Sequence, residues 1–356
     1  MTLSQDYAAR IRAAWQGRIS GCMLGKAVET FSMRAGHDKL TEYLHAVDAL
    51  PLRDYIPFDA HYASTHLFKP CCRGELRASI ADDDINYSVL ALMLLERHGD
   101  ALTTTDVARA WLAYLPVAST YTAERAAYKI LLARGHEWFA EGHELGFDIA
   151  DCADNPYNDW IGAQIRADVY GWVCPGNPDL AAALAEQDAA LSHRGEGIYG
   201  AVFVAVLGAI LLAGAGMAEA VNQALHYIPE DSDCSKAVVD AQRLADDPGG
   251  ANEIRDSHGD MSVVHTVNNL GLVAWALLRH HDDFDAAIGD VVAAGLDTDC
   301  NGATVGALWA LQGMPVPNRW VTPWQSGVGV SLAGMHQLEL DNLVERTVTV
   351  AQQLQP

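Results

Sequence analysis

The sequence is short of basic residues, and this shortage excludes one class of partner. It has 23 Lys and Arg against 46 Asp and Glu, which gives a formal net charge of −23. A protein that binds nucleic acid through its phosphates needs the opposite balance, so we expect no nucleic acid partner. The acidic residues can bind a cation only where they converge in space, which net charge alone does not reveal.

The sequence also lacks paired cysteines and a targeting segment. Its seven cysteines form no CxxC pair, which excludes a zinc ribbon and gives no disulfide framework. The N-terminal stretch MTLSQDYAARIRAAWQGR has neither the basic start nor the apolar core of a signal peptide. We therefore expect a cytoplasmic protein with reduced thiols. The thiols expected in the core or in loops are Cys71, Cys72, Cys152, Cys174 and Cys234.

One long apolar run is present, GAVFVAVLGAILLAGAGMAEA near residues 200–220. Its length is sufficient to cross a membrane. However, glycines interrupt it, alanines are frequent, and basic flanks are absent, which favours a buried helix of a large α-helical protein. We expect no membrane partner.

Alternating strand patterns are rare, whereas apolar residues recur at helical spacing along most of the chain. The chain is 50% hydrophobic and 19% charged, which is enough apolar material for a large core. Two stretches, 36–80 and 136–178, lack periodicity and predict long ordered loops. The expected helices cover 5–30, 84–98, 105–115, 122–134, 178–191, 198–215, 217–226, 235–245, 263–280, 284–294 and 302–312. The sequence therefore predicts one all-α domain over residues 1–356, folded as a compact orthogonal multi-helix bundle.

Two acidic groups stand far apart in the sequence. Three consecutive aspartates begin at Asp82 in ASIADDDINYSV, and Asp297 and Asp299 lie in the glycine-bounded turn of GLDTDCNGATVGALWAL, before a helix expected from about Gly302. Each group alone is explained by helix capping or by a solvated turn. Together, two carboxylate groups at helix starts can cage one or two hard cations, and oxygen ligands favour Mg²⁺, Mn²⁺ or Ca²⁺ over zinc.

Four motifs occur in the order seen in the ADP-ribosylglycohydrolase family, which the sequence resembles over roughly residues 14–320. They are GRISGCMLGKAVE, the aspartate triplet, SHRGEGIYGAVF and GLDTDCNGATVGAL. The resemblance implies an all-α domain with two magnesium ions. It also implies hydrolysis of the bond between the anomeric carbon of ribose and an acceptor such as an arginine side chain.

The resemblance implies a ligand set for two Mg²⁺ ions, with Mn²⁺ as an alternative. An aspartate at position 82 replaces the family's usual threonine, and Cys22 replaces an aspartate. Cys300 stands where a threonine hydroxyl usually completes the centre, and a thiol is a softer ligand that either weakens one metal or favours Mn²⁺. The implied metal ligands are Asp82, Asp83, Asp84, Asp297, Asp299 and Cys300.

The family's chemistry implies roles for several of these residues. Ribosyl bonds break through an oxocarbenium-like transition state, for which metals can orient ribose and activate water. Glu29 matches a mobile glutamate that positions water or shuttles a proton, although its sequence context alone also fits an exposed helix residue. The catalytic candidates are Glu29, Asp84 and Asp299. Cys300, beside acids, is expected to have a raised thiol pKa and to be a poor nucleophile.

Further residues are candidates for binding the substrate. The family places SHRGEGIYGA against the ribose phosphate, where glycines allow close backbone approach to an anion; a turn histidine is the alternative for His193. The binding candidates are His193, Gly195, Gly197, Asn268 and Asn269. Five further residues either line a pocket or form a buried hydrogen-bonded network: Tyr121, Glu124, Arg125, Arg166 and Asp168. The buried network is favoured for Glu124 with Arg125. Arg166 either pairs with Asp168 or binds a phosphate.

Three functions remain open from the sequence. The first is a hydrolase of ADP-ribosyl conjugates, and the second is the same chemistry on a small N-riboside or nucleoside-like metabolite. The third is a non-enzymatic descendant that binds or supports other molecules. Retention of Asp83, Asp84, Asp297 and Asp299 favours an enzyme.

Overall fold

The computed structural model describes residues 3–62, 66–135 and 146–355. Helices make up most of these residues, and the strands among them, β1 (Gly327–Gly329) and β2 (Gln337–Glu339), form one antiparallel pair. Val328 lies opposite Leu338 in this pair. The predicted all-α fold class is confirmed.

The α-helices within the described residues are α1 (Tyr7–Lys26), α2 (Glu29–Ala35), α3 (His37–Ala46), α4 (Asp83–His98), α5 (Thr104–Tyr114), α6 (Thr122–Arg134), α7 (Asp168–Trp172), α8 (Pro178–Ala189), α9 (Gly195–Leu212), α10 (Met217–Ala224), α11 (Asp233–Leu244), α12 (Gly250–Ser257), α13 (Thr266–Arg279), α14 (Phe284–Ala293), α15 (Thr298–Ala310), α16 (Asn318–Val321) and α17 (Leu340–Leu354). Short 3-10 helices are η1 (Lys69–Cys71), η2 (Gly99–Ala101), η3 (Val117–Ser119), η4 (Ile149–Ala153), η5 (Gln164–Arg166), η6 (Leu225–Tyr227) and η7 (Thr322–Trp324).

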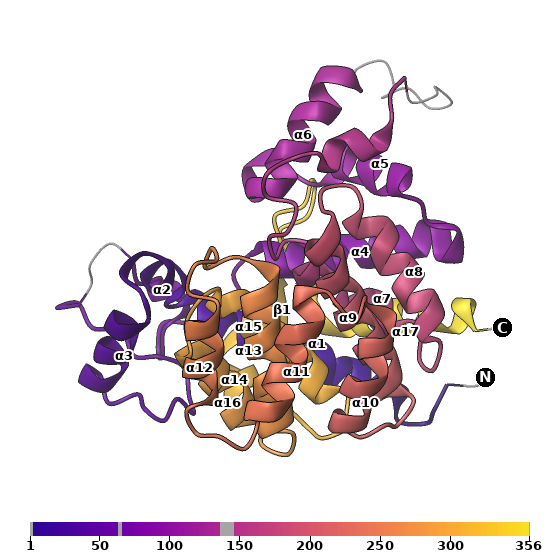
Figure 1. The fold of residues 1–356 in the computed structure, drawn as a ribbon. Helices are drawn as coiled ribbons and strands as arrows, with labels where there is room; N and C mark the ends of the chain where they lie inside the picture. The colour runs from indigo at the N-terminus through magenta and orange to yellow at the C-terminus, as the bar shows by residue number, and fades with distance from the viewer. Residues whose placement is uncertain (1–2, 63–65, 136–145, 356) are drawn as a thin grey trace.

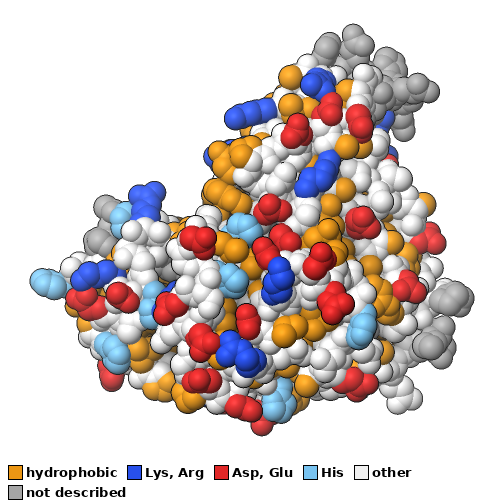
Figure 2. All heavy atoms as spheres, in the orientation of Figure 1, with side chains coloured by type: hydrophobic (Ala, Val, Ile, Leu, Met, Phe, Trp, Pro, Cys, Tyr) orange, Lys and Arg blue, Asp and Glu red, His pale blue; other side chains and the backbone are white. Residues whose placement is uncertain are grey.

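The main body contains α1, α9, α13, α14 and α15, with α2 and α3 on one side and α5 and α6 projecting above it (Figure 1). In this view the N-terminal and C-terminal segments both lie on the side opposite α2 and α3 (Figure 1). In the same orientation, acidic side chains gather on the body at the foot of the projection (Figure 2). Exposed acidic side chains therefore lie near the place where the projection and the body meet (Figure 2).

Most of the expected helices are present with small differences at their ends, but three differences matter. The stretch 36–80 was expected to be irregular, yet α3 forms at its start and buries Leu40, Tyr43 and Leu44, which lie at helical spacing. The expected helix 5–30 is two helices, because α1 ends at Lys26 and α2 begins at Glu29. The C-terminal helix α17 was not expected from the sequence.

Helices α1 and α15 pack with their backbones in contact, and glycines on both helices make this possible. A methyl group on Gly21 would lie 1.9 Å from the carbonyl oxygen of Gly302, closer than any real contact. The end of α1 meets the start of α15, where the Thr298 hydroxyl donates a hydrogen bond to the Gly25 carbonyl at 2.8 Å. This packing brings the segment after Gly25 beside Asp297 and Asp299.

Helix α9 contains most of the long apolar run. By length and composition it can cross a membrane, but 78% of it is buried within the protein. Its buried residues extend without interruption from Gly200 to Leu212. The expectation of a buried core helix is therefore confirmed.

Candidate metal centre

The two acidic groups lie at the starts of two helices. Asp82 is the N-cap of α4, and its carboxylate accepts a hydrogen bond from the Asp84 backbone N–H at 3.0 Å. Asp297 is the N-cap of α15. The prediction that a helix begins near Gly302 is wrong by four residues, because the turn closes earlier, at Leu296, whose φ is 61°. Asp299 therefore lies in the first helical turn.

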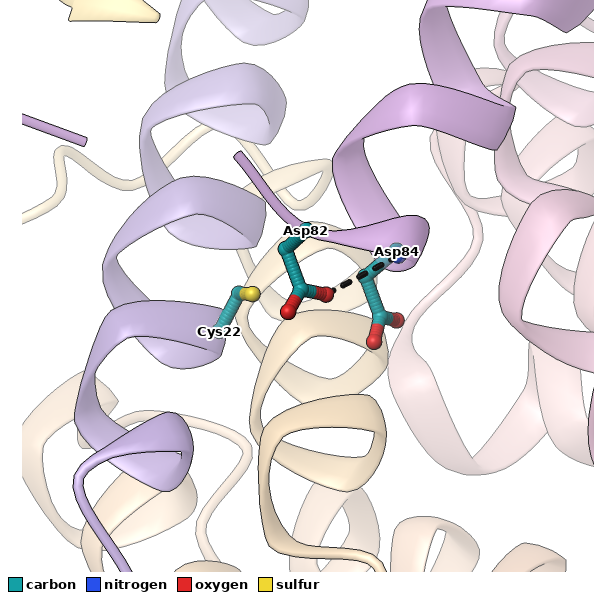
Figure 3. A group of neighbouring side chains, drawn as sticks. All are labelled: Cys22, Asp82 and Asp84. Atoms are coloured by element: carbon teal, nitrogen blue, oxygen red, sulfur yellow. Dashed lines mark hydrogen bonds between the residues drawn. The ribbon is translucent and has the colours of Figure 1, made fainter. Parts of the chain in front are cut away.

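The structure brings the two groups together with residues from α1 and α2. Three sets of side chains have ligand atoms within 4.8 Å of one another: Cys22, Asp82 and Asp84; Asp84, Asp299 and Cys300; and Glu29, Asp297 and Asp299. Figure 3 shows the first set, in which Cys22 on α1 points toward the two aspartates at the start of α4. Among the described residues Asp83 belongs to none of the three sets. We call Glu29, Asp82, Asp83, Asp84, Asp297 and Asp299 the acid centre.

Several oxygens of the acid centre have no partner. Asp84 Oδ2, Asp297 Oδ1 and Asp299 Oδ1 are buried and accept no hydrogen bond within the part of the chain that the structure describes. Burial raises the pKa of Asp297 well above its usual value, and the nearby charge of Asp299 raises it further. Buried carboxylates are normally paired or bound to a metal. The acid centre therefore fits a divalent cation.

Two basic residues of α1 enter the acid centre. The Arg18 guanidinium is fully buried and donates to the Asp84 carbonyl at 2.8 Å and to Asp168. The Lys26 ammonium donates to Asp82 and lies 3.6 Å from Glu29. Neither residue was predicted from the sequence. Their spacing was a usable signal, because Arg18, Cys22 and Lys26 recur every four residues and so share one face of α1.

Glu29 and Cys300 differ in their exposure to solvent. Glu29 begins α2, and its side chain is 24% exposed, so the acid centre reaches solvent on this side. Cys300 is buried, and burial together with Asp297 and Asp84 raises its thiol pKa well above the usual value. The expectation of a raised thiol pKa is confirmed.

Asn268 and Asn269, near the start of α13, position the turn that carries Asp297. The side-chain oxygen Oδ1 of Asn269 accepts hydrogen bonds from the Asp297 backbone N–H at 3.2 Å and from the Asn301 side-chain amide at 2.7 Å. The Asn269 side-chain amide donates to Asn268 at 3.0 Å and to backbone carbonyls before α13. Both asparagines are buried. Their contacts in this structure hold the acid centre in place.

His193 is buried just before α9. One ring nitrogen lies 2.8 Å from the Ser192 hydroxyl, and the other, Nε2, has no partner among the described residues. Burial lowers the pKa of His193 well below its usual value, and the charge of Arg166 lowers it further. His193 is therefore neutral near pH 7.

Gly195 and Gly197 begin α9 and pack against the protein itself. A methyl group on Gly197 would lie 2.3 Å from the Asn158 carbonyl oxygen, so its lack of a side chain serves a close protein contact. Gly195 has a φ of 44° and lies near Asp159. The Asp159 carbonyl accepts a hydrogen bond from Thr266 at 3.0 Å, at the start of α13. Contacts thus connect the start of α9, through α13, to the acid centre.

Glu124 is in a buried network, but its partner differs from the expected one. Glu124 pairs with Arg166 at 3.0 Å, and both side chains are almost fully buried. Arg125 instead lies over the exposed ring of Tyr121 at 5.6 Å. The network is therefore confirmed, and the pairing of Glu124 with Arg125 is wrong, because adjacent residues on α6 face different directions.

The alternative in which Arg166 pairs with Asp168 is also wrong. Arg166 donates to Asp188, on α8, in addition to Glu124. Asp168 instead pairs with Arg18. The helix α7 begins at Asp168, after η5 has ended at Arg166, and the two side chains consequently serve different partners. Arg166 is fully engaged within the protein and is not available to a phosphate.

The acid centre does not coincide with a hollow of about 880 Å³ on the described surface. That hollow lies between α4, α5 and α17, and is lined by Arg97, Asp106, Arg109 and Arg346 among others. None of the acid-centre residues lines it. The candidate site is identified by buried carboxylates without partners among the described residues. A large hollow elsewhere on the surface does not identify it.

Comparisons with known proteins identify the family and the fold of the chain. The model of the ADP-ribosylglycohydrolase family matches residues 3–355. Among solved structures, a chain of an "ADP-ribosylglycohydrolase-related protein complex" is 18% identical, with a TM-score of 0.61, and the match covers 99% of each chain. This likeness shows a common fold. No curated protein matches the sequence at a significant level.

Proposed function

We propose, because this chain belongs to the ADP-ribosylglycohydrolase family, that it is a metal-dependent hydrolase of ribosyl glycosidic bonds. Family membership by itself supports a glycohydrolase type of function. The metal dependence is carried by one observation: three buried carboxylate oxygens, on Asp84, Asp297 and Asp299, lack a partner among the described residues.

The residues that would hold a divalent ion are Asp84, Asp297 and Asp299, with Glu29 and Cys300 beside them. Carboxylate oxygens favour Mg²⁺ or Mn²⁺, and the Cys300 thiol favours Mn²⁺ of the two. When bound, such an ion supplies Lewis acidity toward ribose hydroxyls and water. Arg18 fixes Asp84, and Asn269 fixes Asp297, so the protein holds the ligands in place before any ion binds.

The reaction develops positive charge on the ribose ring, in an oxocarbenium-like transition state. The acid centre concentrates negative charge and stabilises this state when ribose lies against it. Glu29 lies on the solvent side of the centre, where its carboxylate can position a water or move a proton. We infer ADP-ribosyl conjugates as the substrate class from the family.

The test is a release assay with Mg²⁺ or Mn²⁺ on ADP-ribosylated arginine proteins and on free N-ribosides. We expect release of ADP-ribose that stops when EDTA removes the metal. Asp299→Asn should lose activity, whereas Asp341→Asn, an exposed acid that pairs with Arg12, should retain it. Release from free ribosides alone would move the substrate class to small metabolites. No release from any substrate with either metal would contradict the proposal.

A further inference from the structure

We propose that Lys26 takes the place of one of the two cations expected in this family, so that the acid centre of this protein holds a single divalent ion. The inference rests on the proposed function and specifies its metal requirement. It concerns a residue that stands within the first family motif, GRISGCMLGKAVE, yet lies among the carboxylates of the other motifs.

Lys26 lies between carboxylates from three separate elements. Its ammonium donates a hydrogen bond to Asp82, the N-cap of α4. It lies 3.6 Å from Glu29 at the start of α2 and 3.8 Å from Asp299 in the first turn of α15. Its side chain is only 14% exposed, whereas exposed lysines such as Lys236 have 62% exposure. A compact positive charge surrounded by three carboxylates occupies the kind of position that a bound cation takes.

The set formed by Cys22, Asp82 and Asp84 already has protein cations. Lys26 pairs with Asp82, and Arg18 lies 3.3 Å from Asp84 Oδ1. The third member, Cys22, is a thiol at the position where the family has an aspartate. This departure removes one negative charge, whereas Asp82, which stands where the family has a threonine, adds one, and Lys26 pairs with that added carboxylate. A second divalent ion here would be repelled by both the ammonium and the guanidinium.

The remaining sets are open to an ion. They share Asp299, and the atoms Asp84 Oδ2, Asp297 Oδ1 and Asp299 Oδ1 are buried without a partner in the described parts of the chain. Glu29 and Cys300 complete these sets. An ion bound beside Asp299, which the two sets share, would satisfy orphaned oxygens there, and Lys26 would neutralise the Asp82 side.

The test counts Mn²⁺ ions bound to the full chain. Metal-free protein is titrated with Mn²⁺ and the bound ions per chain are measured by electron paramagnetic resonance and elemental analysis. We expect one ion in the wild-type protein and two in Lys26→Met, which removes the ammonium while keeping a long apolar side chain. Lys236→Met, at an exposed ion pair with Asp233, serves as the matched control and should bind one.

The outcomes separate this inference from the proposed function. Two ions in the wild-type protein, or one in both wild-type and Lys26→Met, would overturn the role of Lys26 and leave a metal-dependent hydrolase intact. No ion in either protein would overturn both proposals. Circular dichroism verifies that Lys26→Met is folded.

A second measurement does not depend on that variant. Anomalous diffraction from wild-type crystals grown with Mn²⁺ should show one peak, near Asp297 and Asp299. A peak between Asp82 and Cys22, with Lys26 displaced, would contradict the inference.

Discussion

Two buried charged clusters of this protein differ in how their carboxylates are neutralised. In the Arg166 network, defined as Glu124, Arg166, Tyr170, Asp188, Ser192 and His193, Arg166 donates to both carboxylates. Tyr170 donates to the second oxygen of Asp188 at 2.5 Å. In the acid centre, Lys26 pairs with Asp82 and Arg18 with Asp84, and three buried oxygens remain without a partner among the described residues.

The difference shows that a buried acid does not by itself indicate a ligand site. The Arg166 network is closed, because protein donors satisfy its carboxylates, and Arg166 also lies over the ring of Trp111 at 5.1 Å. The acid centre is open, because its carboxylates outnumber the cations that the protein supplies. An open cluster can accept a cation or protons from outside the chain, whereas a closed one joins helices.

Removal of Arg166 should produce the largest effect on stability. Arg166→Leu leaves Glu124 and Asp188 buried without a cation, which typically costs about 3–5 kcal/mol of unfolding free energy. Arg125→Leu is the matched control, since Arg125 is exposed and lies over Tyr121 in a cation–π arrangement worth about 0.5–1 kcal/mol. Urea unfolding of both variants measures the difference. A loss for Arg166→Leu no greater than that of Arg125→Leu would show that the network is not closed.

Removal of a charge from the acid centre should change the free energy of unfolding in the opposite direction, because the metal-free protein should become no less stable. Asp299→Asn relieves repulsion among buried carboxylates, so in EDTA it should be as stable as the wild type or more stable. With Mn²⁺ at about 100 times its dissociation constant, the wild type should gain about 2.7 kcal/mol and the variant almost nothing. Thermal unfolding with and without Mn²⁺ measures both. An unchanged wild-type melting temperature in millimolar Mn²⁺ would mean that the aspartates serve only as helix caps.

The sequence predicted the acid centre better than the Arg166 network, for a physical reason. Asp297 and Asp299 belong to one local motif at a helix start, so a short stretch of sequence carries the signal. Arg166 and Asp188 are 22 residues apart and meet only through tertiary packing. The pairing of Arg166 with Asp168 was predicted from their closeness in the sequence. That closeness does not determine where the two side chains point, because η5 ends at Arg166 and α7 begins at Asp168.

Other features were visible in the sequence but ambiguous. The aspartate triplet fitted both a cap and a cation site, and Asp82 proves to be a cap that also contacts Lys26. Helix α3 lies in a stretch rich in histidine and aromatics, where Leu40 and Leu44 gave a short helical pattern that the surrounding irregular sequence concealed. Lys26 itself was within a recognised motif, but its role depends on how α1 ends beside α15.

The contact between α1 and α15 offers a way to disturb the acid centre alone. A methyl group on Gly25 would lie 2.1 Å from the Thr298 carbonyl oxygen and 2.4 Å from the Asp299 nitrogen. Gly25→Ala should therefore cost about 1–3 kcal/mol through overpacking and weaken Mn²⁺ binding by moving Asp299. Gly216→Ala is the control, since a methyl group there meets no atom within 4 Å. Calorimetric titration with Mn²⁺ measures the affinity, and an unchanged affinity in Gly25→Ala would show that the helix contact does not position the ligands.

The smallest predicted effect is a pH dependence at the edge of the closed network, where His193 meets Ser192. Burial keeps the pKa of His193 well below its usual value, so the folded protein holds the ring neutral while the unfolded chain protonates it near pH 6.5. The unfolded state therefore binds more protons below that pH, and His193 lowers stability as the pH falls. At pH 5.5, one pH unit below the unfolded pKa, this contribution is at most about 1.4 kcal/mol.

His193→Gln keeps a polar side chain beside Ser192 but cannot titrate, so its stability should fall less between pH 7 and pH 5.5 than that of the wild type. Asp168, whose pKa burial raises to about 6, acts in the opposite direction, because the folded state then binds more protons between its usual pKa and pH 6. Asp168 is present in both proteins, so the difference between their urea-unfolding curves isolates His193. Identical pH profiles for the two proteins would show that the ring gains its proton in the folded state, and that the Arg166 network, like the acid centre, is open to a change in charge.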